Sequence, residues 1–121
     1  MAYEERRNVI LDLSFKFSLD IINYSKLLDE KRKYVIAGQL MKSGTSIGAN
    51  AREAQNAESK ADFIHKMKVA DKEAIEVNYW LSLCNYSADY PPVNNLIDQC
   101  MVIRRVLGKI ISTSIKNSRN P

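Results

Sequence analysis

Four side chains of this sequence have the chemistry for metal binding or nucleophilic catalysis: Asp62, His65, Cys84 and Cys100. The Asp-x-x-His spacing of Asp62 and His65 is similar to one quarter of a di-iron site in a helical bundle. Such a site needs two pairs of this kind and two further carboxylates. Because His65 is the only histidine, one chain cannot supply these ligands. We therefore expect no metal site and no cofactor.

The two cysteines fall on apolar helix stripes near the same end of a helical hairpin. We expect buried, reduced thiols that lie close together, with a disulfide or redox pair as the alternative. A cysteine nucleophile would need a histidine within hydrogen-bond reach, and His65 is several helical turns away. The residues before His65 contain no arginine, so the arginine–histidine motif of helical-bundle ribonucleases is missing, and no Gly-rich phosphate loop precedes a helix. We expect no catalytic residues, and a protein that is not an enzyme.

The elements that must position these residues are helices. The chain of 121 residues has 45% hydrophobic and 26% charged residues, with only four glycines and three prolines, which favours a single domain (1–121) built of long helices. A net charge of +4 permits an anionic partner without requiring one. The N-terminal residues show no signal peptide, and no apolar run is long enough to span a membrane. Together with free thiols this predicts a cytoplasmic protein without a membrane partner.

Apolar residues recur at steps of three and four along four segments, which predicts helices at about 5–29, 33–57, 60–87 and 92–116. Ser59 and Asp62 form a variant of a capping box before the third segment, and Pro92 fits an early position of the fourth. Short connections predict an all-α, up-and-down antiparallel four-helix bundle. The expected core stripes are Ile10, Leu13, Phe17, Ile21, Tyr24 and Leu28; Val35, Leu40, Ile47 and Ala54; Phe63, Met67, Ala70, Ala74, Val77, Leu81 and Cys84; and Leu96, Cys100, Ile103, Leu107, Ile110 and Ser114.

Two of these segments carry a second apolar row. The rows are Ile75, Tyr79, Leu83 and Tyr86 in the third segment, and Phe15, Leu19 and Ile22 in the first. A broad core-facing arc explains such rows, because a globular helix often buries more than a narrow stripe. The alternative is a subunit interface, since large exposed apolar patches usually mark association sites.

Small and polar residues interrupt the second segment. Gly44, Ile47, Gly48 and Ala51 fall on one side, where a neighbouring backbone can approach closely. Each glycine costs about 1 kcal/mol relative to alanine in a helix interior, so packing must compensate. A polar row follows beside it: Ser43, Ser46, Asn50 and Glu53. We expect Asn50 to bridge to a partner helix, and Arg52 and Glu53 to pair with Glu76 or Lys72, as structural fasteners.

Residues 43–50 (SGTSIGAN), 52–54 (REA), 57–67 (AESKADFIHKM) and 79–81 (YWL) closely resemble the 23S ribosomal RNA intervening sequence proteins, a family of S23-like four-helix bundles. Lys42 stands where the family often has arginine, and Ala51 where it commonly has isoleucine. The resemblance covers the length of the chain. It implies a ring-shaped homopentamer without an established catalytic reaction. A related accessory protein of retroelements binds nucleic acid and a reverse transcriptase, which implies RNA or DNA as a partner here.

Basic residues supply the expected phosphate contacts. Arg105, Lys109 and Lys116 share one face of the fourth segment, with Arg104 beside them, and Lys68 and Lys72 share a face of the third. Solvated outer faces explain such stripes equally well. We expect a non-enzymatic, oligomeric accessory protein that contacts nucleic acid; the alternative is a structural adaptor that binds a protein partner through Tyr79, Leu83 and Tyr86. The residues expected to contact phosphates are Lys42, Arg52, Arg104, Arg105 and Lys109.

Overall fold

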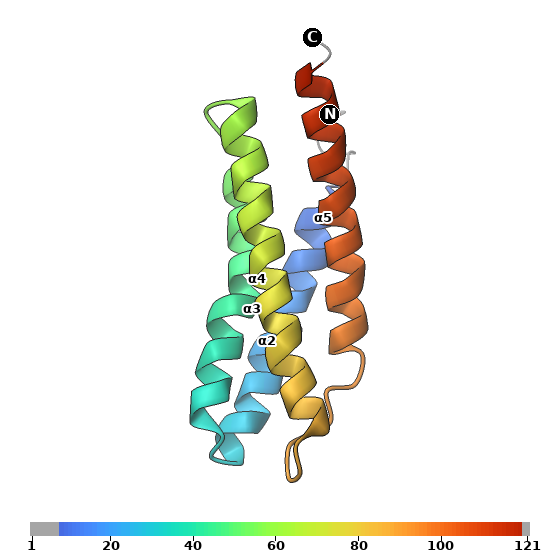
Figure 1. Cartoon of the computed structure of the whole chain (residues 1–121). Coiled ribbons are helices and arrows are strands. Elements are labelled where there is room, and N and C mark those ends of the chain that lie inside the picture. Colours follow the sequence, from blue (N-terminus) through green and yellow to red (C-terminus); the bar gives the residue numbers. More distant parts are fainter. Residues whose placement is uncertain (1–7, 120–121) are drawn as a thin grey trace.

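The computed structural model describes residues 8–119, which form four antiparallel helices packed side by side (Figure 1). The helices are α2 (Val9–Glu30), α3 (Tyr34–Ala54), α4 (Lys60–Tyr86) and α5 (Leu96–Arg119). α2 and α4 each pack against both α3 and α5, and neither diagonal pair of helices is in contact over these residues. The predicted all-α, up-and-down bundle is confirmed. Because the number of helices is even, α2 starts and α5 ends towards the same, upper end in Figure 1.

Local hydrogen bonds define both ends of α2. The side-chain oxygen of Asn8 accepts a hydrogen bond from the backbone N–H of Leu11 at 3.3 Å, which caps the first turn. At the other end Arg32 adopts a left-handed φ of 61°. The backbone N–H groups of Arg32 and Lys33 then donate back to carbonyls of the last turn, at 2.9 and 2.8 Å. This is the Schellman arrangement, here closed without a glycine.

The start of α4 confirms the predicted cap. Ser59 Oγ accepts a hydrogen bond from the backbone N–H of Asp62 at 3.0 Å. The Asp62 carboxylate in turn accepts from the backbone N–H of Glu58 at 3.1 Å. The two side chains therefore satisfy backbone donors that the helix itself leaves without partners.

The fourth helix begins later than predicted, at Leu96 instead of residue 92. Tyr24 Oη of α2 donates a hydrogen bond of 2.7 Å to the carbonyl of Pro91, and Asn94 has a left-handed φ of 52°. The chain therefore crosses from α4 to α5 as a tethered, non-helical segment with Val93 buried. α3 ends at Ala54 instead of residue 57, in a tight turn of i to i+3 hydrogen bonds. The predicted start of the first helix at residue 5 lies outside the described residues.

The core follows the predicted stripes with one clear exception. Buried apolar side chains on all four helices include Ile10, Phe17, Ile21, Tyr24, Leu28, Leu40, Ile47, Met67, Val77, Leu81, Ile103 and Leu107. Val35 was expected on the α3 stripe but is 83% exposed, because the core-facing side of that turn is taken by Ala37. The second apolar rows face outward, with Phe15 58% and Tyr79 59% exposed. They do not form a wider arc of the core.

Candidate nucleic-acid interface

The glycines of α3 allow α2 to approach closely. A Cβ added to Gly44 would lie 2.8 Å from Cγ2 of Ile21, and one added to Gly48 would lie 3.3 Å from Oγ of Ser14. Neither position tolerates a larger side chain without movement of α2. The expected close approach of a neighbouring helix is therefore present, and this segment is continuous helix rather than a loop.

Three of the four residues in the polar row beside the glycines, Ser43, Ser46 and Asn50, donate hydrogen bonds to carbonyls of α3. Ser46 Oγ donates to the carbonyl of Lys42 at 2.6 Å, and Asn50 Nδ2 donates to the carbonyl of Ser46 at 2.9 Å. Asn50 therefore bonds its own helix, and the expected bridge to a partner helix is not formed among residues 8–119. A side-chain amide reaches the carbonyl four residues back easily in a helix, which removes the need for a distant partner.

The expected ion pairs of Arg52 and Glu53 with α4 are also not formed among residues 8–119. Arg52 lies towards α2, where it lines a shallow cleft of about 190 Å³ with Phe15. Glu76 instead accepts a hydrogen bond from Trp80 Nε1 of its own helix at 3.4 Å. Arg52 and Glu53 consequently remain available to groups outside this chain.

The residues considered for metal chemistry have other roles. Asp62 caps α4 and lies 3.6 Å from Lys66 Nζ, while His65 is exposed on the outer surface. Within residues 8–119 no three side chains of histidine, cysteine or acidic type are grouped as metal ligands would be.

Cys84 and Cys100 are free, buried thiols, as predicted. Burial raises the pKa of both, and that of Cys100 to about 11, so both are protonated at neutral pH. Cys100 Sγ donates to the carbonyl of Ala74 at 3.2 Å, which places it beside the middle of α4. Ala74 and Cys84 are ten residues apart on that helix, roughly 15 Å at 1.5 Å per residue. The expectation that the two thiols lie close together is therefore wrong, because Cys100 meets α4 well above Cys84.

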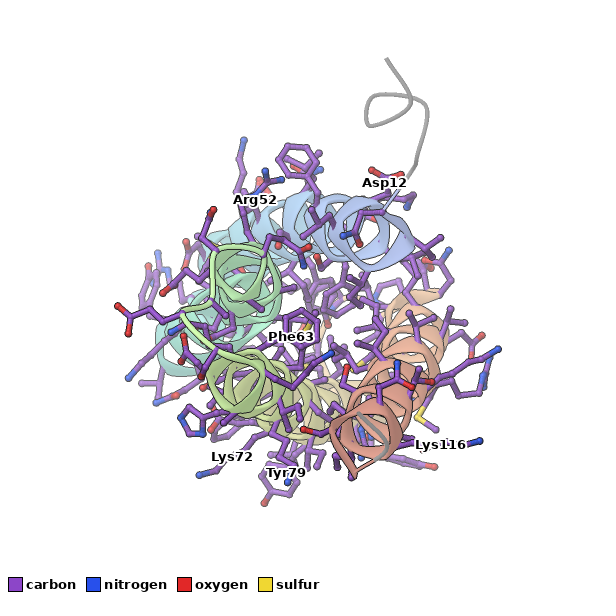
Figure 2. The ribbon with its side chains drawn as sticks, turned by 90° about the horizontal axis from the view of Figure 1, so that it is seen from above. Asp12, Arg52, Phe63, Lys72, Tyr79 and Lys116 are labelled. Carbon is purple, nitrogen blue, oxygen red and sulfur yellow. The ribbon has the colours of Figure 1, made fainter. Side chains whose placement is uncertain are left out.

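The five expected phosphate-binding residues do not form one patch. Lys42 and Arg52 belong to α3, whereas Arg104, Arg105 and Lys109 belong to α5, the helix diagonally across the bundle. Seen from above, Arg52 and Lys116 extend from opposite sides of the molecule, while Phe63 points inward between the helices (Figure 2). A single chain therefore offers two separate basic surfaces.

Arg104 is held by a neighbour on α4. Its Nε lies 2.9 Å from Oδ1 of Asp71 and its Nη2 lies 3.2 Å from Oδ2, a two-point ion pair between α4 and α5. The hydrogen bond to Asp71 raises the pKa of Arg104 further. This geometry fixes the planar guanidinium and neutralises its charge. Arg104 is thus a helix-to-helix fastener within the chain.

Arg105 and Lys109 remain exposed on the outer face of α5. They are four residues apart, hence on one helix face, and neither has a hydrogen-bond or ion-pair partner in the described part of the chain. Beyond Asp98, α5 contains five arginines and lysines and no acidic residue. Gly108 stands between the two, and a Cβ added there would meet no atom within 4 Å. The sequence alone shows that residues 99–119 contain no acidic residue. Which of their basic side chains face solvent depends on the rotation of α5 about its axis.

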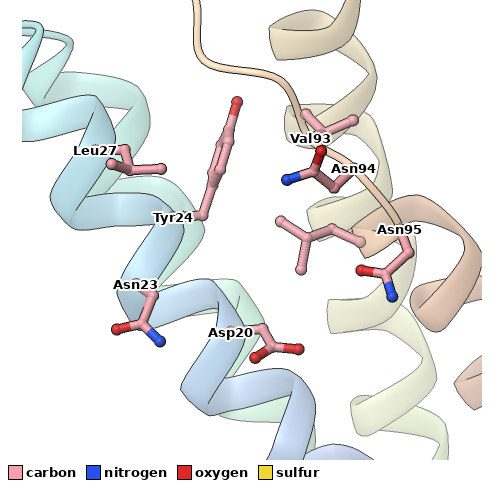
Figure 3. Close-up of a pocket in the computed structure, with 8 residues that line it drawn as sticks. Asp20, Asn23, Tyr24, Leu27, Val93, Asn94 and Asn95 are labelled. Carbon is pink, nitrogen blue, oxygen red and sulfur yellow. The ribbon is translucent and has the colours of Figure 1, made fainter.

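A hollow lies between α2 and the connection that precedes α5 (Figure 3). It has a volume of about 260 Å³, and its polar lining includes Asp20, Asn23 and Asn95. A hydrogen bond from Lys16 lowers the pKa of Asp20, and Gln99 donates to the same carboxylate at 3.1 Å. The carboxylate is therefore ionised and already engaged. The lining residues contain no cysteine, histidine, lysine or arginine, so this hollow provides no nucleophile with an adjacent base.

Comparison with known proteins agrees with this architecture. The sequence profile of the family described as "23S rRNA-intervening sequence protein" matches residues 6–109. A crystal structure of a protein with unknown function from the S23 ribosomal protein family, from Bacteroides thetaiotaomicron VPI-5482, superposes with a TM-score of 0.80 and 39% sequence identity. The match covers 84% of this chain and 97% of that one. No curated protein matches the chain.

The fold is an all-helical bundle with a closed apolar core. The exposed basic and apolar residues described above lie on its outer faces. The chain belongs to the 23S rRNA-intervening sequence protein family. No helix within residues 8–119 has the length and apolar character needed to cross a lipid bilayer.

Proposed function

We propose that this protein is a non-enzymatic, self-associating accessory protein of the cytoplasm that binds nucleic-acid backbones through the outer face of α5. The observation that carries the proposal is the exposed pair Arg105 and Lys109 on a helix without acidic residues beyond Asp98. An isolated, solvated helix face usually mixes both signs of charge, as α2 does. A run of one sign attracts phosphate instead.

Helix electrostatics do not account for this charge. Lysine and arginine near a helix C-terminus offset the negative end of the helix dipole, and Lys116 fits that explanation. The effect is confined to about the last turn. Arg105 and Lys109 lie well before the last turn of α5 and need another reason. Lys68 and Lys72 are exposed on the neighbouring helix α4, so α4 and α5 together present four exposed basic residues at this level of the bundle.

Self-association is part of the proposal because one chain has too little charge for tight binding. Each phosphate contact contributes a slope of about −0.7 to −0.9 in log K against log salt, so affinity grows with the number of contacts. Copies assembled through the exposed apolar row Ile75, Tyr79, Leu83 and Tyr86 would repeat the α5 face several times. The family resemblance suggests five copies.

Binding across a salt series tests the proposal. Single-stranded RNA and duplex DNA of unrelated sequences should bind the protein at low salt, with affinity falling steeply as salt rises. The double variant Arg105→Glu, Lys109→Glu should weaken binding to both, because two favourable phosphate contacts become repulsive. The slope against log salt should become shallower by about 1.4 for single strands for each binding copy of the chain.

A matched variant identifies the surface. Lys26→Glu with Arg52→Glu makes the same charge change at exposed positions of α2 and α3, away from the outer face of α5. Equal loss of binding in both double variants would show that net charge, and not the α5 face, controls affinity. Wild-type protein that binds neither RNA nor DNA at low salt would rule out nucleic acid altogether.

A protein partner is the second candidate, favoured by the aromatic side chains of the α4 row. Tyr79 is 59% and Tyr86 88% exposed, and tyrosine is enriched at protein interfaces. In this case the protein would act as a structural adaptor. The affinity for this protein partner should not depend on salt concentration, and Tyr79→Glu should lower it.

A further inference from the structure

Two different outward surfaces of the lower half of the bundle are apolar. The first is the α4 row, Ile75, Tyr79, Leu83 and Tyr86, with exposed fractions of 50%, 59%, 39% and 88%. Figure 2 shows Tyr79 pointing away from the helices. The second, here named the α3 patch, consists of Val35, Gly38 and Met41, which follow one another at steps of three and are all exposed. Val35 is 83% exposed, although it is a β-branched apolar residue.

Among residues 8–119, no packing contact explains why position 38 is a glycine. Gly44 and Gly48 of the same helix are explained by the approach of Ile21 and Ser14, but a Cβ added to Gly38 would meet no atom within 4 Å. A glycine in a helix interior costs about 1 kcal/mol relative to alanine. The missing side chain leaves a flat place between Val35 and Met41, wide enough for a side chain from outside to lie against the helix backbone.

The charges around the two surfaces are complementary. Residues 34–51, which contain the α3 patch, carry one basic residue, Lys42, and no acidic one, while Lys31 and Lys33 just before them already pair with Asp89 within the chain. Residues 73–86, which contain the α4 row, carry two acidic residues, Glu73 and Glu76, and no basic one, and Lys72 lies just above this segment. Lys42 next to the α3 patch and Glu76 next to the α4 row form no ion pair among the residues that the structure places.

The two surfaces also lie at the same level. α3 starts at the lower end of the bundle and α4 ends there, so residues 35–42 and 75–86 both occupy the lower half in Figure 1. Two copies standing side by side in the same orientation can therefore bring the α4 row of one against the α3 patch of the other. Glu76 and Lys42 then both stand at the upper border of the contact.

We propose that a second copy of this chain docks head to tail, with its α4 row on the α3 patch and Tyr79 seated over Gly38. This inference rests on the self-association proposed above and identifies the surface that receives the α4 row. Because the two surfaces differ, a row of bound copies keeps one free α4 row at one end and one free α3 patch at the other, so further copies can add. Pairing of α4 with α4 would instead stop at a dimer.

Single substitutions and their mixture test the contact. Tyr79→Glu disables the α4 row, and Val35→Glu disables the α3 patch with an acid in the first turn of α3, where the helix dipole favours it. Tyr86→Glu, at an 88% exposed position, replaces Tyr79→Glu if that variant does not fold. Val9→Glu, at a 56% exposed position near the upper end of α2, is the matched control. Masses are measured by light scattering, and folding by circular dichroism.

We expect wild type and Val9→Glu to be oligomers, each single surface variant to be a monomer, and an equimolar mixture of Tyr79→Glu with Val35→Glu to form dimers and nothing larger. The mixture retains one intact α4 row and one intact α3 patch, so one contact forms and none can follow. A Val35→Glu protein that associates like wild type overturns the inference while leaving self-association intact, as does a mixture that stays monomeric. A monomeric wild type overturns both.

Discussion

Arg104 of α5 and Asp71 of α4 are joined by two hydrogen bonds, while Arg105, the next residue, extends into solvent without a partner in residues 8–119. Neighbouring residues of a helix point about 100° apart, so Arg104 faces α4 while Arg105 faces solvent. We therefore expect Arg104 to contribute to the stability of the fold and Arg105 to contribute to nucleic-acid binding.

We expect Arg104→Gln to lower the free energy of unfolding by about 1 kcal/mol, because the two-point ion pair is only partly exposed and its loss leaves Asp71 without its partner. Arg105→Gln should change stability by less than about 0.5 kcal/mol. Nucleic-acid affinity should show the opposite order, with Arg105→Gln the more harmful. Urea unfolding and a binding titration of both variants check this; a larger binding loss for Arg104→Gln would contradict the assignment.

The two glycines of α3 should respond in opposite directions to alanine. Gly38→Ala should raise the free energy of unfolding by about 0.5–1 kcal/mol, since its Cβ meets nothing and alanine favours the helix. Gly44→Ala should lower it by about 1–2 kcal/mol, because its Cβ would lie 2.8 Å from Ile21 Cγ2. Both are measured by urea unfolding in the Tyr79→Glu background, where association adds no stability. Equal shifts would refute the close α2–α3 contact.

The hydrogen bond from Tyr24 to the Pro91 carbonyl should stabilise the entry to α5. Tyr24→Phe leaves a buried carbonyl without its donor and should cost about 1–2 kcal/mol of unfolding free energy. Tyr34→Phe, at a 61% exposed position, provides the control and should cost almost nothing. Hydrogen exchange should also show faster opening of residues 91–96 in Tyr24→Phe. Unchanged protection there would argue against the tether.

Alkaline pH should destabilise the protein partly through Cys100. Burial raises its pKa from 9.0 to about 11 in the folded state. Below pH 9 the thiol is protonated in both states, but between about 9 and 11 only the unfolded chain releases its proton, so the unfolding free energy falls as pH rises. Fully developed, this contribution amounts to roughly 2–3 kcal/mol. Cys100→Ala should show a shallower loss of stability between pH 8.5 and 11 by about this amount; identical pH profiles would contradict the shift.

The fold could be predicted from sequence because its core depends on local periodicity. Phe17, Met67 and Leu107 repeat at steps of three and four with their neighbours, and a helix turns every such stripe to one side without help from distant residues. The cap of α4 at Ser59 was equally local. The prediction that Val35 is a core residue was wrong. α3 has few large apolar residues, so its apolar stripe is poorly defined, and the spacing of Val35 from Leu40 fits either side of the helix.

The parts of the site that escaped prediction depend on contacts between helices. The start of α5 is set by Tyr24, 67 residues before Pro91, and no nearby residue signals it. The engagement of Arg104 depends on Asp71 facing it across a helix pair. The sequence spacing predicts that Asn50 reaches a partner helix, but its amide finds an acceptor one turn back, at the carbonyl of Ser46. Residue type and spacing limit which groups share a face, but the relative rotation of two helices decides which of them meet.

Because α2 starts and α5 ends towards the same pole of the bundle, the chain enters and leaves the four helices there. At the opposite pole lie the α2–α3 and α4–α5 connections, joined by the ion pair of Lys31 and Asp89 at 3.1 Å. Immobilising the protein by a terminal tag would therefore leave that pole and the lower flanks unobstructed, which suits surface-based measurements of association between copies.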